Sequence, residues 1–91
     1  MQDSIYLVLT FKWYDLMIDG LKDVEYRAIV SHWLVHLWYK RDVIRYARFA
    51  RGYTNRSILR PVKLIDVGPC PYPEWNDSYF RLHLGPIVSE L

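Results

Sequence analysis

The sequence has a single cysteine, Cys70, and therefore cannot form an internal disulfide. It also lacks a Cys-x-x-Cys pair of the kind that holds structural zinc. No apolar run approaches membrane-spanning length, and no basic segment with a cleavage site opens the chain. By elimination, these absences predict a protein of the reducing cytoplasm that has no membrane partner.

Signatures of catalysis and of cofactor binding are also scarce. The chain has only four glycines and no glycine-rich loop that could cradle a phosphate. Its serines and its cysteine have no histidine and aspartate at a recognisable spacing, which argues against nucleophilic Ser or Cys catalysis. We therefore expect no cofactor.

Two histidines, His32 and His36, are spaced four residues apart, as metal ligands on one helix face would be. Trp33 follows His32, so the glutamate of the zinc-protease pattern is absent and only half a ligand set is present. The position of both histidines opposite the apolar helix face favours solvated surface residues and no metal site. An acid–base pair for RNA cleavage is the alternative.

Apolar and aromatic residues, in contrast, are plentiful. The 91 residues are 52% hydrophobic and 16% aromatic, which is enough for one core and predicts a single small domain over residues 1–91. Four Trp and eight Tyr are many for this length. We expect some of these rings on the surface, where they stack on bases or on the side chains of a partner.

Hydrophobic periodicity predicts an α+β fold. Alternating or β-rich segments predict strands over residues 4–10, 23–27, 43–50, 57–67 and 79–84, and helical spacing predicts short helices over 11–19 and 29–39. Pro61 indicates an edge position or a bulge in its strand, and the prolines of 68–73 predict a stiff loop. About five strands with two short helices, not interleaved as regular βαβ units, predict a small curved sheet or barrel with flanking helices.

Charge is distributed unevenly along the chain. Residues 40–63 carry a net charge of +7 and the rest of the chain −5, which gives the overall +2. A basic cluster of this kind attracts polyanions and predicts contact with nucleic acid. The alternative is that half of these arginines pair with acids elsewhere. The basic residues of the segment are Lys40, Arg41, Arg45, Arg48, Arg51, Arg56, Arg60 and Lys63.

The stretch from Gly20 to Arg27 is the most informative motif. Gly20 follows an amphipathic segment and is expected to end the helix in a left-handed conformation. In the strand that follows, Glu25 and Arg27 share one face, so that Lys22, Glu25 and Arg27 gather at one strand mouth. Such a cluster can hold a phosphate or polarise a carbonyl. The alternative is a salt-bridged trio that only fixes the turn.

The spacing G-x-K-x-x-E-x-R just after a short N-terminal helix resembles the signature of the ASCH domain, a relative of the PUA domain. Three further segments resemble the first strand and helix, the central strand and turn, and the closing strand of that family: residues 5–17, 48–53 and 79–88. Together the segments cover most of the chain in the expected order. The resemblance implies a PUA-like β-barrel and a function in RNA binding or RNA processing.

Some small ASCH proteins are acetylcytidine amidohydrolases that use a Lys, a Thr and a Glu. The resemblance places the Lys at Lys22 and the Glu in the loop that contains Glu74, which makes Lys22, Glu25 and Glu74 the candidate catalytic residues. At the position of the Thr, however, this chain has Glu25, which has no hydroxyl. A carboxylate is a poor substitute for an activated Thr nucleophile, so Thr-dependent amide hydrolysis is not expected. Ribonuclease activity and plain RNA binding remain compatible with the motif.

Cations and rings also mix around the predicted strand 43–50 and its turn, at Tyr46, Arg48, Arg51 and Tyr53. This mixture suits single-stranded nucleic acid, because rings stack on bases while guanidinium groups hold phosphates. Ordinary cross-strand pairing on a solvated sheet face is the alternative.

Three hypotheses follow. The first is an RNA-binding module whose cleft is formed by Lys22, Glu25 and Arg27 and extended by Arg48, Arg51 and Tyr53. The second is a small ribonuclease or a hydrolase of a modified nucleobase that uses the same cleft. The third is a protein-interaction module, for example a phage or mobile-element inhibitor of a host factor. A homodimer formed through an exposed strand edge is compatible with each of them.

Overall fold

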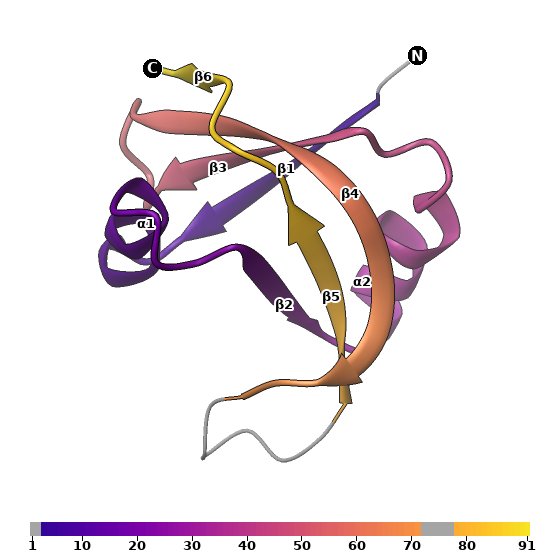
Figure 1. The fold of residues 1–91 in the computed structure, drawn as a ribbon. Coiled ribbons are helices and arrows are strands. Elements are labelled where there is room, and N and C mark those ends of the chain that lie inside the picture. The colour runs from indigo at the N-terminus through magenta and orange to yellow at the C-terminus, as the bar shows by residue number, and fades with distance from the viewer. Residues whose placement is uncertain (1–2, 72–77) are drawn as a thin grey trace.

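The computed structural model describes residues 3–71 and 78–91, in which one strongly curled sheet is flanked by two short helices (Figure 1). The helical elements are α1 (Phe11–Ile18), α2 (Ser31–His36) and the 3₁₀ turn η1 (Trp38–Lys40). The strands are β1 (Ser4–Leu9), β2 (Val24–Ala28), β3 (Tyr46–Arg51), β4 (Ser57–Pro69), β5 (Ser78–Leu84) and β6 (Ser89–Glu90). The predicted α+β class is confirmed, and the sheet forms a half-barrel.

The strand order is β1-β3-β4-β5-β2, and the short β6 adds to β4. β1 runs parallel to β3, while every other pairing among the described strands is antiparallel. β1 and β2 therefore form the two edges of the sheet. Because the sheet curls, these edges approach each other closely enough for Arg27 Nη2 to lie 3.5 Å from the carbonyl oxygen of Val8.

The long strand β4 makes this curl possible. Its first part pairs with β3 up to Pro61, and its second part pairs with β5 from Val62 onward, with a register shift between Val62 and Leu64. A bulge bends a strand and increases its twist. The bulge that Pro61 indicated is thus confirmed, and it lies where β4 passes from one partner to the other, at the bend visible in Figure 1.

The core lies inside the curl. Alternate residues of β1 are buried, as the period of a half-buried strand requires. α1 covers this core with Tyr14 and Met17, and the indole of Trp38 stacks on Phe80 with ring centroids 5.3 Å apart. The largest fully buried side chains are Tyr14, Phe49, Phe80, Leu7, Met17, Leu37, Ile58 and Leu82.

Three predicted boundaries were wrong by a few residues, each for a tertiary reason. The helix predicted over 29–39 ends at His36, because Leu37 leaves helical geometry to enter the core and Trp38 packs on Phe80. The strand predicted from residue 43 begins at Tyr46, since the preceding residues turn back to hydrogen-bond the carbonyl of Lys40. The first two residues of the predicted loop 68–73 extend β4 instead.

Two glycines have positive φ. Gly20, at φ 75°, ends α1 as expected and turns the chain toward β2. Gly52, at φ 58°, forms the turn after β3, and a β-carbon at this position would lie 2.6 Å from the ring of Phe11.

In the described residues, no helix is long and apolar enough to cross a membrane.

An ion-pair cluster joins β4 to β5 on the face away from the core. Asp66 accepts hydrogen bonds of 2.8 and 2.7 Å from the guanidinium of Arg81 and lies 3.0 Å from Nε2 of His83. The hydrogen bonds from Arg81 are the main cause that lowers the pKa of Asp66 to about 2. The cluster therefore links strand pairing to the ionised state of one carboxylate.

We expect Asp66→Asn to lower the free energy of unfolding at neutral pH and to reduce its dependence on acid. A carboxylate with a lowered pKa in the folded state contributes stability above its unfolded pKa and loses that contribution as the pH falls through the folded value. For Asp66 this window runs from 3.8 down to about 2. Urea unfolding across this window and at neutral pH tests the expectation. Asp19→Asn, at the exposed end of α1, is the matched control. If the free energy of unfolding of Asp66→Asn depends on pH as in the wild type, the expectation is contradicted.

Candidate binding cleft at the open edges of the sheet

The gap between the two sheet edges forms a cleft of about 420 Å³, which we call the edge cleft. One wall is β1 and the start of α1, and the other wall is β2 with the residues before it. The side chain of Trp33 from α2 closes one end. The lining residues are Tyr6, Leu7, Val8, Leu9, Thr10, Trp13, Lys22, Glu25, Tyr26, Arg27 and Trp33.

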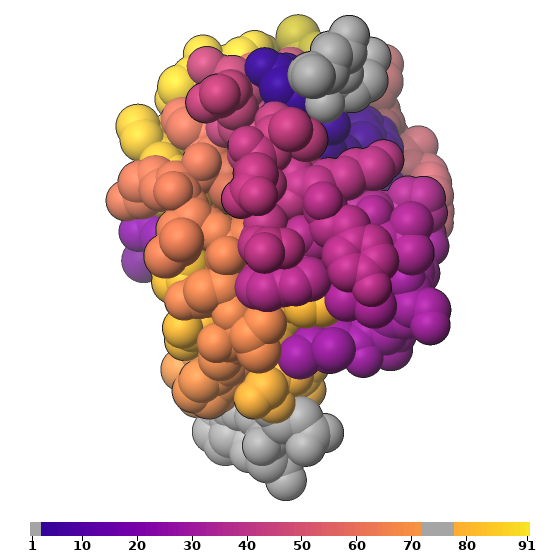
Figure 2. Space-filling model, turned by 90° about the vertical axis from the view of Figure 1, so that its right-hand side faces the viewer, coloured from indigo at the N-terminus to yellow at the C-terminus, as the bar shows by residue number. Residues whose placement is uncertain are grey.

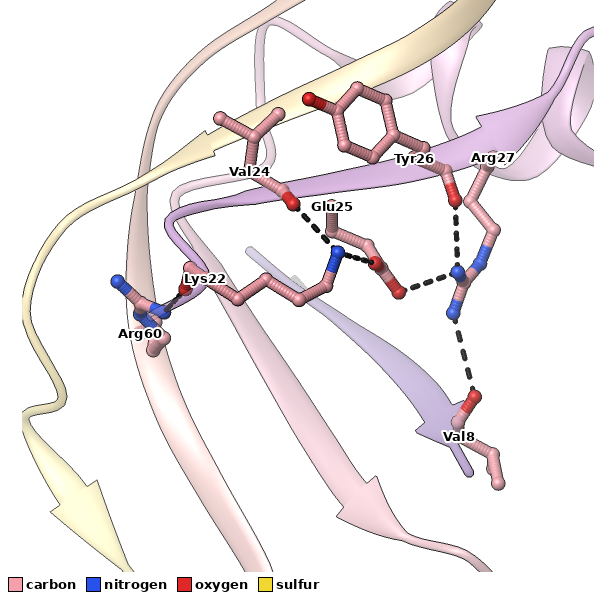
Figure 3. Close-up of polar contacts among 7 residues, drawn as sticks. All are labelled: Val8, Lys22, Val24, Glu25, Tyr26, Arg27 and Arg60. Carbon is pink, nitrogen blue, oxygen red and sulfur yellow. Dashed lines mark hydrogen bonds and ion pairs between the residues drawn. The ribbon is translucent and has the colours of Figure 1, made fainter. Parts of the chain in front are cut away.

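The three charged residues of the motif meet in this cleft, as Figure 3 shows. Lys22 Nζ lies 3.1 Å from Glu25 Oε1 and donates a hydrogen bond of 2.9 Å to the carbonyl of Val24. The other carboxylate oxygen of Glu25 lies 2.5 Å from Arg27 Nη1, which also bonds the carbonyl of Tyr26 at 3.0 Å. Lys22 is 5% exposed and Glu25 is 4% exposed. The three side chains therefore lie together, as predicted, and two of them are buried.

The position of Lys22 depends on a buried arginine of β4. The guanidinium of Arg60 donates to the carbonyls of Lys22 at 2.6 Å and Gly85 at 2.7 Å, and to Oδ1 of Asp23 at 2.8 Å. Arg60 is 3% exposed. The sequence placed it in the basic cluster of residues 40–63, but its contacts with Lys22 and Asp23 hold the segment between α1 and β2 against β4. Figure 3 shows the contact with the carbonyl of Lys22. A buried role was not visible in a segment so rich in arginine.

Lys22, Glu25 and Arg27, which we call the triad, have a net charge of +1, and Glu25 is the counter-ion of both cations. Both oxygens of Glu25 face a cation, so this carboxylate holds Lys22 and Arg27 in place and has no free oxygen directed at a substrate. Arg27 is the most accessible of the three, with a side chain that is 17% exposed. The arrangement can therefore present fixed positive charge to an anionic or carbonyl oxygen in the cleft.

Aromatic rings surround these cations. Lys22 Nζ lies 5.1 Å from the ring centroid of Trp13 and 5.2 Å from that of Tyr26, and the guanidinium of Arg27 lies 5.4 Å from that of Trp33. These are cation–π distances. Trp13 and Trp33 belong to the segments 11–19 and 29–39, whose helical spacing predicted only two short helices. Only the overall excess of Trp and Tyr pointed to rings at a binding surface.

The backbone of β1 adds polar groups to the cleft. The carbonyls of Asp3 and Leu9 accept hydrogen bonds from Arg45 and Gly52, so these alternate residues face β3. The residues between them, including Tyr6 and Val8, direct their N–H and C=O groups to the open edge. The cleft thus has a row of backbone donors and acceptors along one wall.

Three other predicted site residues, Arg48, Arg51 and Tyr53, lie outside the edge cleft. Arg48 donates to the hydroxyl of Ser57 at 2.9 Å on the outer face of β3. Arg51 pairs with Asp15 of α1, which raises the pKa of Arg51 and lowers that of Asp15, mainly through their shared hydrogen bonds. Tyr53 is 98% exposed in the following turn. Glu74 lies outside the described residues.

A metal centre is not evident in the part of the chain that the structure describes, because no three His, Cys, Asp or Glu side chains gather there. In comparisons with known proteins, no family model, curated protein or solved structure matches this chain. The function of the edge cleft is therefore inferred from its own geometry and chemistry.

We expect Glu25→Gln to destabilise the fold strongly. It leaves the buried amine of Lys22 and the guanidinium of Arg27 without their shared counter-ion, and removing one partner of a buried ion pair costs on the order of 3 kcal/mol. Urea unfolding at neutral pH measures the loss. The matched control is Asp15→Asn, which breaks the solvent-exposed pair with Arg51 and should cost much less. Equal losses of unfolding free energy in the two variants would show that the buried ion pairs of Glu25 contribute no more than an exposed pair.

Proposed function

We propose that this chain is a single-stranded nucleic-acid-binding module that prefers RNA, of the ASCH type on a PUA-like barrel, and that the edge cleft receives a base. The observation that carries the proposal is the combination of aromatic rings with fixed cations and an unpaired strand edge in one cleft. Each of these features matches a different part of a nucleotide.

The rings and the cleft volume suit a flat, partly apolar group. Trp13, Tyr26 and Trp33 offer ring surface, and a volume of about 420 Å³ is within the range of small-molecule sites, roughly 300–1,000 Å³. Aromatic side chains bind unpaired bases by stacking, largely independent of sequence. Because the cleft is recessed between two strands, a base has to leave a duplex to enter it, which favours single strands.

The polar groups suit the edge of a base. Backbone N–H and C=O groups of β1 face the cleft, and Arg27 directs a guanidinium across it toward Val8. Bases in single strands are recognised by hydrogen bonds to their exposed edges. The fixed positive charge of the triad favours carbonyl-rich bases, whose oxygens accept hydrogen bonds from cations.

A basic groove supports the proposal from a neighbouring surface. This groove, of about 570 Å³, runs between the turn that precedes β3 and the middle of β4. Arg41, Arg45 and Lys63 line it together with a single acid, Asp42. Figure 2 shows this face, where residues near 40–46, in magenta to rose, lie beside the orange atoms of β4. Such a groove can hold the backbone of a strand whose base lies in the edge cleft.

We expect Trp33→Ala to weaken binding of a fluorescent single-stranded RNA at least fivefold, because a base–ring stack contributes about 1–3 kcal/mol. Fluorescence anisotropy with single-stranded RNA, single-stranded DNA and duplex RNA measures both affinity and preference. Tyr39→Ala is the matched control, since Tyr39 is exposed and lines neither the edge cleft nor the basic groove. Circular dichroism verifies that both variants fold. Equal affinity of the two variants would refute a base in the edge cleft.

We expect Arg45→Ala and Lys63→Ala each to weaken RNA binding and to lower the slope of log affinity against log salt by about 0.7, the value for one lost single-strand phosphate contact. Titrations at four salt concentrations give these slopes. Arg56→Ala serves as the comparison, because Arg56 is an exposed cation outside the groove. If all three variants change the slope equally, the groove has no special role in the contact.

A further inference from the structure

A third hollow, of about 330 Å³, lies between the edge cleft and the basic groove. It shares Tyr6 and Trp33 with the edge cleft and Ile44 with the basic groove. The three hollows therefore follow one another along the open edge of β1 and around the turn before β3. We call the middle one the histidine hollow, because His32 and His36 line it.

Three basic side chains meet in the histidine hollow. His32 and His36 lie on successive turns of α2 with ring centroids 4.6 Å apart, and Lys40 of η1 follows four residues later. No carboxylate is among the lining residues, which are Ser4, Ile5, Tyr6, His32, Trp33, His36, Lys40, Val43 and Ile44. The hollow is thus lined by potential cations without an opposing acid.

These three side chains differ from the five Lys and Arg side chains that the fold engages in ion pairs. Lys22, Arg27, Arg51, Arg60 and Arg81 each pair with a carboxylate. Within residues 3–71 and 78–91, neither an ion pair nor a side-chain hydrogen bond to a carboxylate involves His32, His36 or Lys40. Their charge is left uncompensated in a concave site, and an anion is the natural complement.

Two of the three basic side chains are histidines. A histidine side chain ordinarily changes its charge between pH 5 and 8. The polar groups that line the hollow with the two imidazoles are the hydroxyl of Ser4 and the phenol of Tyr6 from β1 and the amine of Lys40 from η1. The ring of Trp33 lies edge-on to that of His32 with centroids 4.5 Å apart, and Val43 and Ile44 add only apolar surface. Asp3 lies beside the rim, with its carboxylate 3.5 Å from the Ser4 hydroxyl. Protonation of both rings would place three like charges together, which an anion relieves.

We propose that the histidine hollow is a phosphate-binding subsite that fills when His32 and His36 are protonated. The subsite takes a tetrahedral oxyanion. It rests on the proposed function for its biological ligand, the phosphate of the nucleotide adjacent to the base in the edge cleft. The two hollows are about 10 Å apart along β1, estimated from three residues at about 3.3 Å each. A bound strand would then run from the edge cleft through this subsite into the basic groove.

Sulfate is the first probe, because its charge is constant across the pH range in which imidazoles titrate. We expect it to shift the ring resonances of His32 and His36 in NMR spectra, and to bind at least tenfold more tightly at pH 5.5 than at pH 7.5. His83 is an internal control, since its ring faces Asp66 on β5. A chelator in every sample removes metal ions. Equal binding at both pH values, or shifts confined to His83, would overturn the proposal.

Variants separate the two kinds of cation. The double variant His32→Gln/His36→Gln should lose the pH dependence of sulfate binding, whereas Lys40→Met should weaken binding at both pH values and keep that dependence. His32, His36 and Lys40 are all exposed, so thermal unfolding should change little in the variants. A pH dependence that survives the double histidine variant would contradict the assignment.

A competition experiment distinguishes this inference from the proposed function. With a short single-stranded RNA bound at pH 6, sulfate should displace the RNA in the wild type and have less effect in the double histidine variant. RNA binding that ignores both sulfate and the histidine variants would overturn the subsite and leave the edge cleft as the site. Sulfate binding in a protein that binds no RNA would support the anion site and refute the proposed function.

Discussion

The sheet leaves its two edge strands unpaired with each other, and this constraint shapes the rest of the molecule. Among the strands that the structure describes, β1 pairs only with β3 and β2 only with β5, so each has one side of backbone groups without a partner from these strands. Curling brings these two open sides together, and the side chain of Arg27 bridges them at Val8 in place of a strand ladder. The fold thereby gains a cleft whose walls are polar backbone and whose interior contains buried charge.

Buried charges need partners at fixed positions, and Arg60 holds the segment that carries Lys22 in place. Its guanidinium connects β4 to the carbonyl before β2 and to the carbonyl after β5. A guanidinium can satisfy several acceptors in a fixed plane, which a lysine amine cannot do in the same way. The side chain of Lys22 is therefore delivered to Glu25 from a rigid segment. Preorganisation of this kind lowers the entropic cost of binding a ligand in the cleft.

Local rules in the sequence were sufficient for most elements and for the charged motif. Gly20 ends α1 in the left-handed region, and the alternation of β2 brings Glu25 and Arg27 to one face. Which distant segments of the chain pair with each other could not be predicted from such local rules. The parallel pairing of β1 with β3 decides that Arg48 lies opposite Tyr6, outside the edge cleft, and that Arg51 can reach Asp15. The aromatic walls depend on the same non-local pairing.

The same argument explains why the basic segment does not act as a single surface. Arg60 is buried among carbonyls, and Arg51 is engaged by Asp15 of α1. The net charge of the segment therefore overstates the charge that is available to a polyanion. The basic groove and the histidine hollow gather accessible cations in concave sites, which makes local placement more informative than the sum over the sequence.

An open strand edge ordinarily invites another strand, and the way in which this edge is covered bears on its partner. Charged side chains that point across an edge oppose strand addition. Here Arg27 reaches over Val8, and Trp33 of α2 stands beside Tyr6, so an extended peptide would have to displace both to pair along β1. A flat base needs only the space between the rings and a few backbone groups. The covered edge therefore favours a nucleotide over a protein strand as the occupant of the cleft.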